Sequence, residues 1–223
     1  MYENEIIFNR ETLDKNFFKI ENVENDNACF YRALSNCIKF NSINDINLLY
    51  SNDFIEQTNL SKELQHMIFS WISYNKNKKI KYTDNLELDI ETLIELIHDI
   101  SYNEYLFLYK HFAGNFNGLP NRWGSFCEQS VLSHILKIPI IVLSLNKYDN
   151  KYDKIISGRI TENLIPYHNT RFKIIQISGN EYIKQKKPIF LLWRKKNKKN
   201  LEHYLSLYPK KNYELEIMDK LNI

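Results

Sequence analysis

Residues 24–35 read Glu24-Asn25-Asp26-Asn27-Ala28-Cys29-Phe30-Tyr31-Arg32-Ala33-Leu34-Ser35 and place a cysteine where a polar loop gives way to a helix-forming segment. Apolar residues then recur at the spacing of one helical face: Phe30, Ala33, Leu34, Cys37 and Ile38. This pattern predicts a helix with one buried stripe that begins at or just after Cys29. Asp26 or Asn27 can cap its first turn by accepting from free backbone amides.

A thiol at this junction has chemistry that a thiol inside a helix lacks. The positive end of the helix dipole favours thiolate over thiol, and the amides of the first turn can stabilise an oxyanion on an attacked carbonyl. The competing interpretation is a small buried hydrophobe. We keep that interpretation for Cys37 and Cys127, which lie within apolar helical patterns. Cys29 precedes the stripe and is the candidate nucleophile.

A thiol hydrolase also needs a histidine, which is usually far from the cysteine in sequence. Of the six histidines, four fall on predicted helices, where surface or helix-end roles are expected: His66, His98, His111 and His134. His168 lies in a polar loop, whereas His203 opens a predicted strand directly after a loop and can face a cleft. His203 would take the thiol proton and later donate it to the leaving amine.

Composition narrows the class of protein. The 223 residues are 43% hydrophobic, enough for the core of one domain, and 30 Lys and Arg against 27 Asp and Glu give a charge of only +3. That charge is too mild to argue by itself for nucleic acid or an anionic membrane as a partner. Residues 1–20 lack a secretory signal pattern, and the uncharged run Ile138–Leu145 is too short to span a membrane.

Cysteine usage and motifs add further limits. Three cysteines without a close pair indicate a reducing compartment. The sequence contains no metal-ligand spacing and no glycine-rich phosphate loop, so we expect neither a metal nor a cofactor. The excess of Asn, Lys, Ile and Tyr is typical of an AT-rich genome.

The remaining patterns place helices early and strands late in the chain. Helical spacing covers 60–72 and most of 84–112, which predicts a helical lobe over about residues 44–118. Ser125 and Glu128 form a capping box for a helix that ends at Lys137. Strands are predicted at 138–145, 172–177, 188–193 and 203–207. The basic run Arg194–Lys199 is expected to be a solvated turn. Together these elements predict an α+β or α/β sandwich.

Three segments resemble motifs of the ovarian-tumour (OTU) cysteine proteases, and they occur in that family's order. Asp26 to Ala33 resembles the Asp-Gly-Asn-Cys-aromatic/Leu-Phe-Arg-Ala element, and His203-Tyr204-Leu205-Ser206-Leu207 resembles the histidine block. The middle block is matched by Trp123-Gly124, Glu128, Leu132-Ser133, Leu136 and Pro139-Ile140-Ile141-Val142. The matched segments bracket residues 26–207, nearly the whole chain.

The resemblance implies an α+β, papain-like OTU fold over residues 1–223, with a central sheet between helical layers and a helical lobe. It implies a deubiquitinase that cleaves the isopeptide bond after the ubiquitin C-terminal tail, without cofactor. Carried over by residue, Cys29 is the nucleophile, His203 the general base and acid, and Asp26 the acidic residue that shapes the cysteine loop. Amides around Asn27, Ala28 and Cys29 would line the oxyanion hole, and Trp123 would lie near the cleft or pack in the core.

Two departures from the family pattern leave alternatives open. Asn27-Ala28 replaces Gly-Asn in the cysteine loop, so that loop lacks its flexible glycine. Many family members carry Asp or Asn two residues after the histidine, where this chain has Leu205. The third member of the triad would therefore be an upstream polar residue such as Asn22 or Glu24, or be absent.

Competing functions follow from the same residues. Leu205 motivates a catalytically inactive, OTU-like ubiquitin-binding module, and Arg194–Lys199 motivates a nucleic-acid-binding domain, which the low net charge ranks last. For the leading hypothesis we expect a monomer that binds ubiquitin and polyubiquitin chains, with ubiquitin-like modifiers as further candidates. The helical lobe and the loops at Lys147–Lys154 and Arg194–Lys199 would contact ubiquitin. We expect a cytoplasmic protein or, in an intracellular bacterium, an effector delivered to the host cytosol.

Overall fold

The structure is a computed structural model. It describes residues 12–24, 28–41, 54–83, 86–112, 124–145, 171–196 and 201–221. Three predicted site residues, Asp26, Asn27 and Trp123, lie outside these ranges, as do His168 and the loop at 147–154.

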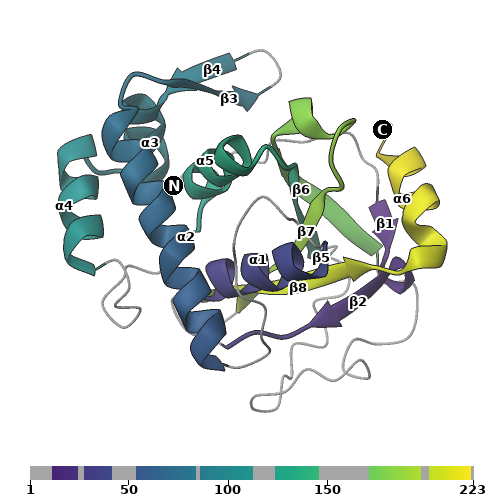
Figure 1. The fold of residues 1–223 in the computed structure, drawn as a ribbon. Coiled ribbons are helices and arrows are strands. Elements are labelled where there is room, and N and C mark those ends of the chain that lie inside the picture. The colour runs from purple at the N-terminus through teal and green to yellow at the C-terminus, as the bar shows by residue number, and fades with distance from the viewer. Residues whose placement is uncertain are drawn as a thin grey trace.

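A six-stranded sheet forms the centre of the fold, with strand order β1-β6-β5-β7-β8-β2. Its strands are β1 (Thr12–Asp14), β2 (Phe18–Glu21), β5 (Ile140–Leu145), β6 (Arg171–Ser178), β7 (Ile189–Lys196) and β8 (Leu201–Pro209). Only β5 and β7 pair in parallel, and the other neighbours are antiparallel. The short strands β1 and β2 both come from the start of the chain, and they form the two edges of the sheet (Figure 1).

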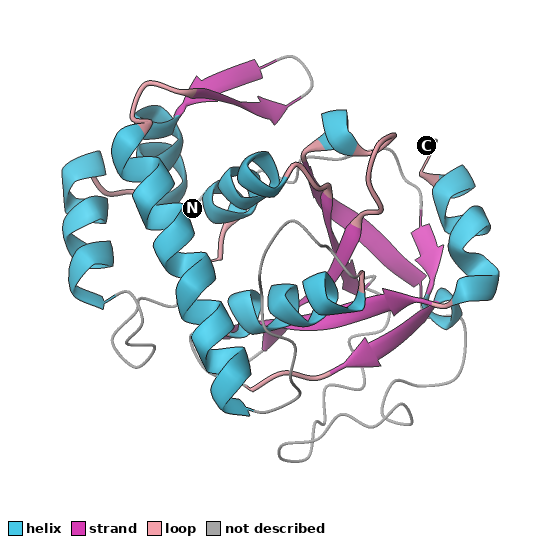
Figure 2. Cartoon of the chain, in the orientation of Figure 1, coloured by secondary structure: helices cyan, strands magenta, loops and turns pink. Residues whose placement is uncertain are grey.

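The helices and a separate hairpin complete the fold. The helices are α1 (Cys29–Phe40), α2 (Phe54–Tyr74), α3 (Ile90–His98), α4 (Tyr102–Phe112), α5 (Phe126–Leu136) and α6 (Glu214–Lys220). The described residues also form the short 3-10 helices η1 (Lys15–Phe17), η4 (Asn180–Tyr182) and η5 (Lys211–Tyr213). Strands β3 (Lys79–Thr83) and β4 (Leu86–Asp89) form a two-stranded sheet beside the helical lobe. Figure 2 shows α2, α3 and α4 gathered on one side of the molecule and the central sheet on the other.

Both faces of the central sheet are buried, as the continuous apolar run of β5 predicts. Ile140 and Val142 belong to one core cluster, whereas Ile141 and Leu143 belong to the cluster on the opposite face. The first cluster includes residues of α1 to α5, and the second includes Ile217 of α6 together with residues of β1 and β2. The expected α+β class, with a central sheet between helical layers, is confirmed, and the second layer is the thinner one.

Helix α1 begins at Cys29, as predicted, and the predicted capping residues Asp26 and Asn27 lie outside the described residues. The N-cap is Ala28, and no side chain of the described residues caps the first turn. Residues 29–38 are all buried, because α1 lies between α2 on one side and the sheet on the other. Packing of this buried surface therefore stabilises α1, as it does most helices in proteins.

Several other predicted elements are confirmed in detail. Ser125 and Glu128 form both bonds of a capping box at the start of α5, and Lys137 ends α5 in the left-handed conformation. Asp89 caps α3 by accepting from the Thr92 amide at 2.8 Å. The α3 and α4 helices match the periodic segments, but the β3–β4 hairpin before them was not predicted.

The predicted turn at Arg194–Lys199 is wrong for its first half. Strand β7 continues to Lys196, and Arg194, Lys195 and Lys196 pair with His203, Glu202 and Leu201 of β8. Residues 197–199 lie outside the described part of the chain. Backbone hydrogen bonds to a neighbouring strand outweigh the repulsion within this short run of basic side chains.

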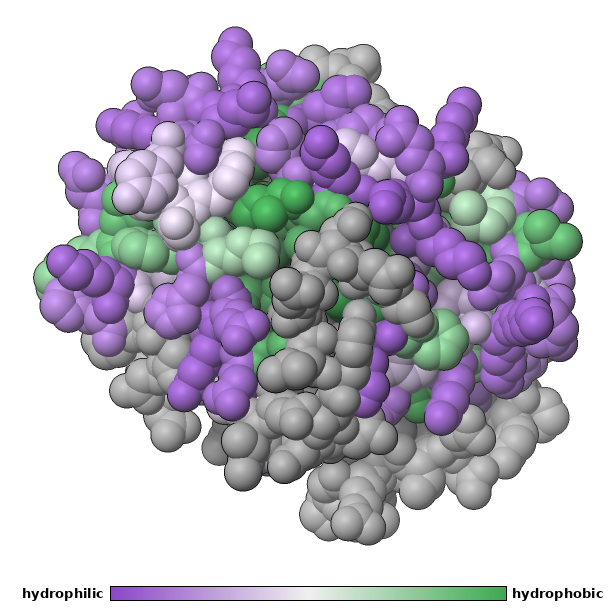
Figure 3. Space-filling model, viewed as in Figure 1, coloured by the Kyte–Doolittle hydropathy of each residue, from purple (hydrophilic) through white to green (hydrophobic). Residues whose placement is uncertain are grey.

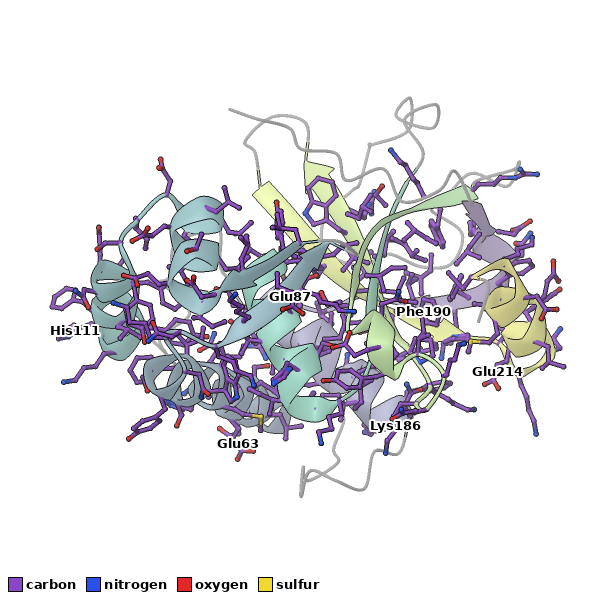
Figure 4. The ribbon with its side chains drawn as sticks, turned by 90° about the horizontal axis from the view of Figure 1, so that it is seen from above. Glu63, Glu87, His111, Lys186, Phe190 and Glu214 are labelled. Atoms are coloured by element: carbon purple, nitrogen blue, oxygen red, sulfur yellow. The ribbon has the colours of Figure 1, made fainter. Side chains whose placement is uncertain are left out.

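Hydrophilic side chains cover much of the described surface on the face drawn in Figure 3, with hydrophobic side chains visible near its middle. Viewed from above, His111 of α4 and Glu214 of α6 lie at opposite ends of the molecule, with Phe190 of β7 between them (Figure 4). Among the described residues, no helix is both long and apolar enough to cross a membrane.

Replacing Phe190 by alanine tests the second core cluster. Phe190 is 2% exposed, and its ring lies 5.2 Å from the ring of Phe18. Phe190→Ala should lower the free energy of unfolding by about 3–5 kcal/mol, because it removes an aromatic ring from a packed core. Urea denaturation followed by circular dichroism measures the change. Leu215→Ala is the control, since Leu215 is 82% exposed on α6 and should change stability by no more than about 0.5 kcal/mol.

Candidate active site

The packing of α1 on β8 brings the predicted nucleophile and the predicted base to the same end of these elements. The ring of Phe30 lies 5.3 Å from that of Tyr204, and the Ser206 hydroxyl donates to the Ala33 carbonyl at 3.0 Å. These contacts advance along α1 and β8 in the same direction. Cys29 and His203 directly precede Phe30 and Tyr204 in sequence, so both lie at the end of α1 and β8 where this contact begins.

His203 is held by a side chain from the start of the chain. It is the third residue of β8 rather than the first, which corrects the expectation that it opens the strand. Its ring is 7% exposed, and its Nε2 lies 3.2 Å from Oδ1 of Asn22, just beyond β2. An amide oxygen only accepts hydrogen bonds, so Nε2 must carry the proton. In the neutral ring Nδ1 is then the basic nitrogen, as a proton acceptor for a thiol requires.

The contact between His203 and Asn22 favours Asn22 over Glu24 as the third member of the triad. Leu205 is fully buried in the second core cluster and has no polar group to offer. Glu24 is exposed, whereas Asn22 reaches the histidine. Sequence reasoning named Asn22 as one option, and the pairing of β2 with β8 is what brings it to His203.

The cysteine loop is only partly described. Cys29 is 8% exposed at the first turn of α1, and Ala28 is fully buried, with its carbonyl accepting from the Arg32 amide at 2.9 Å. The oxyanion-hole candidate Asn27, the loop residue Asp26 and the cleft candidate Trp123 lie outside the described residues. Their assignments stay predictions.

The other two cysteines are structural, as predicted. Cys37 is 2% exposed and donates to the Phe190 carbonyl at 3.4 Å, and its burial raises the pKa of the thiol to about 12. Burial, together with the negative charge of Glu128, raises the pKa of the Cys127 thiol well above 9.0. Both groups therefore stay protonated near neutral pH and are poor nucleophiles.

Glycine at position 124 permits a close approach of the middle block to α1. Its φ is 117°, in the region that favours glycine, and a Cβ there would lie 2.5 Å from the Cβ of Phe30. The residue after Trp123 thus packs against the residue after Cys29. Steric contact with Phe30 therefore explains why glycine follows Trp123.

A buried ion pair lies directly behind this turn. Glu128 is fully buried, and its Oε1 accepts from the Tyr105 hydroxyl at 2.7 Å and lies 2.9 Å from Nε2 of His98. Its Oε2 accepts from the amide of Ser125 at 2.9 Å and from the hydroxyl of the same residue at 2.5 Å. The capping-box glutamate was predicted, but its partner His98 was expected at the surface or at a helix end. It is at the end of α3 and buried.

The same residues form the one group, within the described ranges, whose donor atoms are close enough for a metal. The ligand atoms of His98, Cys127 and Glu128 all lie within 4.8 Å of one another. Both oxygens of Glu128 already accept hydrogen bonds, from Tyr105 and from Ser125. An ion pair therefore accounts for this cluster better than a metal ion does.

Comparison with known proteins finds similar solved structures. No protein-family model matches the sequence, and no curated protein matches it. The viral OTU domain protease of Taggert virus is 15% identical, with 90% of this chain and 87% of that chain covered and a TM-score of 0.48. An OTU domain in complex with ubiquitin is 12% identical, with 96% and 95% covered and a TM-score of 0.46. The Hazara virus OTU bound to ubiquitin is 14% identical, with 90% and 87% covered and a TM-score of 0.45.

These similar structures are all OTU domains, and their TM-scores all lie below 0.5. At 12–15% identity, the chemistry of this chain has to come from the geometry of its own residues.

The ion pair predicts a distinctive acid dependence of stability. Burial alone raises the pKa of Glu128, but the charge of His98 and hydrogen bonds from His98, Ser125 and Tyr105 lower it to about 2, from 4.5. The folded pKa lies below the unfolded one, so the stabilisation is present above pH 4.5 and is lost as the pH falls toward 2. Glu128→Gln should lower stability at pH 7 by about 1–3 kcal/mol, because an amide cannot accept every hydrogen bond that the buried carboxylate accepts.

Denaturation between pH 7 and pH 2 checks this prediction. The variant should lose less further stability between pH 4.5 and pH 2 than the parent does. Glu63→Gln is the control, because Glu63 is exposed on α2 (Figure 4). Equal acid dependence in the parent and in Glu128→Gln would contradict the ion-pair assignment.

Proposed function

We propose that this protein is an OTU-type cysteine protease that hydrolyses isopeptide bonds after the C-terminal tail of ubiquitin. The observation that carries the proposal is the bond between Nε2 of His203 and Oδ1 of Asn22. It fixes the ring tautomer of a histidine that lies at the Cys29 end of the α1–β8 contact. A cysteine, a histidine and an orienting amide are the parts of a papain-like thiol protease.

The reaction follows from these groups. Nδ1 of His203 takes the proton of the Cys29 thiol, and the thiolate attacks the carbonyl carbon of the scissile bond. The negative charge that develops on the carbonyl oxygen is stabilised by backbone amides at the start of α1, with Asn27 as the proposed further donor. His203 then gives its proton to the leaving lysine amine. Water, deprotonated by the same ring, hydrolyses the thioester.

The substrate class rests on the three OTU-like sequence blocks. Ubiquitin ends in two glycines, so we expect the cleft beside Cys29 to admit a chain without side chains. Asn22 holds the ring without a charge of its own, and it thereby fills the role that Leu205 cannot fill. We also propose that the protein acts in the cytoplasm, or in the host cytosol if a bacterium secretes it.

A ubiquitin probe with a C-terminal electrophile tests the nucleophile and the base together. The parent protein should form a covalent adduct that is visible as a gel shift. Cys29→Ala should abolish the adduct, and His203→Ala should slow its formation strongly, because the thiol then loses its proton acceptor. Cys37→Ala is the matched control, since Cys37 is a buried structural thiol.

Persistence of the adduct in Cys29→Ala would contradict the assignment of the nucleophile. A folded parent that binds ubiquitin without forming an adduct would instead support the inactive ubiquitin-binding module.

The role of Asn22 predicts a loss of rate without a loss of binding. Asn22→Ala should lower kcat on a fluorogenic ubiquitin substrate by between about 10-fold and 10⁴-fold, because the ring loses the group that fixes its tautomer. KM should stay within about 2-fold, since Asn22 contacts the histidine rather than ubiquitin. Glu24→Ala is the matched control from the same segment and should keep the parent kcat.

A further inference from the structure

Three residues that directly follow the predicted site residues meet in the interior. Phe30 follows Cys29, Gly124 follows Trp123, and Tyr204 follows His203. The Tyr204 hydroxyl donates to the Gly124 carbonyl at 3.0 Å, and the ring of Tyr204 packs edge-on against that of Phe30. Gly124 in turn approaches Phe30 too closely for any side chain. The cysteine segment, the middle block and the histidine block therefore contact one another through Phe30, Gly124 and Tyr204.

Gln129 of α5 joins this meeting point. It is 1% exposed, and its Nε2 donates to the Gly124 carbonyl at 2.9 Å and to the Tyr204 hydroxyl at 3.0 Å. The donors and acceptors balance: the amide nitrogen has two protons, the hydroxyl has one, and the carbonyl oxygen has two lone pairs. The amide, the hydroxyl and the carbonyl therefore form a closed triangle of hydrogen bonds. Rotating the Gln129 amide by 180° would place Oε1 against the Gly124 carbonyl oxygen, and two acceptors cannot form a hydrogen bond.

This arrangement is not the one that stability alone would select. Oε1 of Gln129 is buried and accepts no hydrogen bond from the described residues. A buried acceptor left without a donor destabilises a fold, and such exceptions in native proteins tend to occur where function constrains the residue. An apolar side chain of the same size would avoid that cost but would lose the triangle.

We propose that Gln129 is a positioning residue, which sets the geometry between Cys29 and His203 through the Gly124 carbonyl and the Tyr204 hydroxyl. The proposal deepens the proposed function and rests on it for the reaction concerned. Gln129 lies between the block that carries the histidine and the turn that contacts α1. A displacement of β8 relative to α1 of about 1 Å is enough to lower a rate by about 100-fold.

Two variants remove the triangle in different ways. Gln129→Leu keeps the volume of the side chain and removes both donated hydrogen bonds. Tyr204→Phe removes the hydroxyl and keeps the ring against Phe30. Ser130→Ala is the matched control, because it removes another buried hydrogen bond of α5, to Ser178 of β6 at 3.2 Å, and leaves the triangle intact.

The first readout does not depend on ubiquitin. The rate at which iodoacetamide alkylates Cys29 is measured against pH by mass spectrometry, which reports where the thiol ionises. In the parent we expect a midpoint below the ordinary cysteine value of about 8.5, because His203 and the helix dipole favour the thiolate. In Gln129→Leu and Tyr204→Phe the midpoint should rise toward that value, and in Ser130→Ala it should not move.

The second readout is turnover of a fluorogenic ubiquitin substrate. We expect kcat to fall by roughly 10- to 100-fold in Gln129→Leu and in Tyr204→Phe, with KM within about 2-fold, since neither residue is placed to contact ubiquitin. The double variant should lose little more than each single variant, because the bonds act as one unit.

The outcomes separate the two proposals. Unchanged alkylation profiles in folded Gln129→Leu and Tyr204→Phe would overturn the positioning role, even if the parent cleaves ubiquitin. Shifted profiles in a parent without ubiquitin activity would support the positioning role and overturn the proposed function. If Gln129→Leu does not fold, Tyr204→Phe decides the question alone.

Discussion

The contact between α1 and β8 is the constraint on which the rest of the structure depends. Helix α1 follows both edge strands of the sheet, β1 and β2, and β8 is among the last elements of the chain. Their packing therefore brings together parts of the chain that are far apart in sequence. Every residue of α1 from Cys29 to Ile38 is buried, and Ser206 of β8 donates to the α1 carbonyl of Ala33. This packing places Cys29 and His203 at the same end of the two elements.

The elements that sequence analysis found are those whose side chains repeat. The apolar stripe after Cys29, the capping box at Ser125 and the apolar run of β5 all have a local period or motif, and each forms where predicted. The edge strands β1 and β2, the β3–β4 hairpin and α6 are short, and their patterns are too brief to separate from those of a loop. Paired strands carry no complementary sequence pattern, so the strand order could not be predicted from the sequence either.

The candidate site divides in the same way. Cys29 and His203 stand out from their local context and their order in the chain. The bond from Asn22 to His203 joins residues 181 positions apart, and only the pairing of β2 with β8 brings them together. His98 looked like an ordinary helix-end residue because nothing near it in sequence indicates that Glu128 faces it. Contacts of this kind depend on tertiary packing, and local patterns carry no record of them.

The use of an amide to orient His203 has a consequence for the electrostatics of the interior. Within the described part of the chain, Glu128 is the buried carboxylate, and it is matched by His98 and three hydrogen-bonding groups. A carboxylate beside His203 would have required a second desolvated charge in the same small protein, at a cost of several kcal/mol. Asn22 supplies direction without charge, and it has no proton to gain or lose. The orienting side chain is therefore the same chemical species in a neutral cytosol and in an acidified compartment.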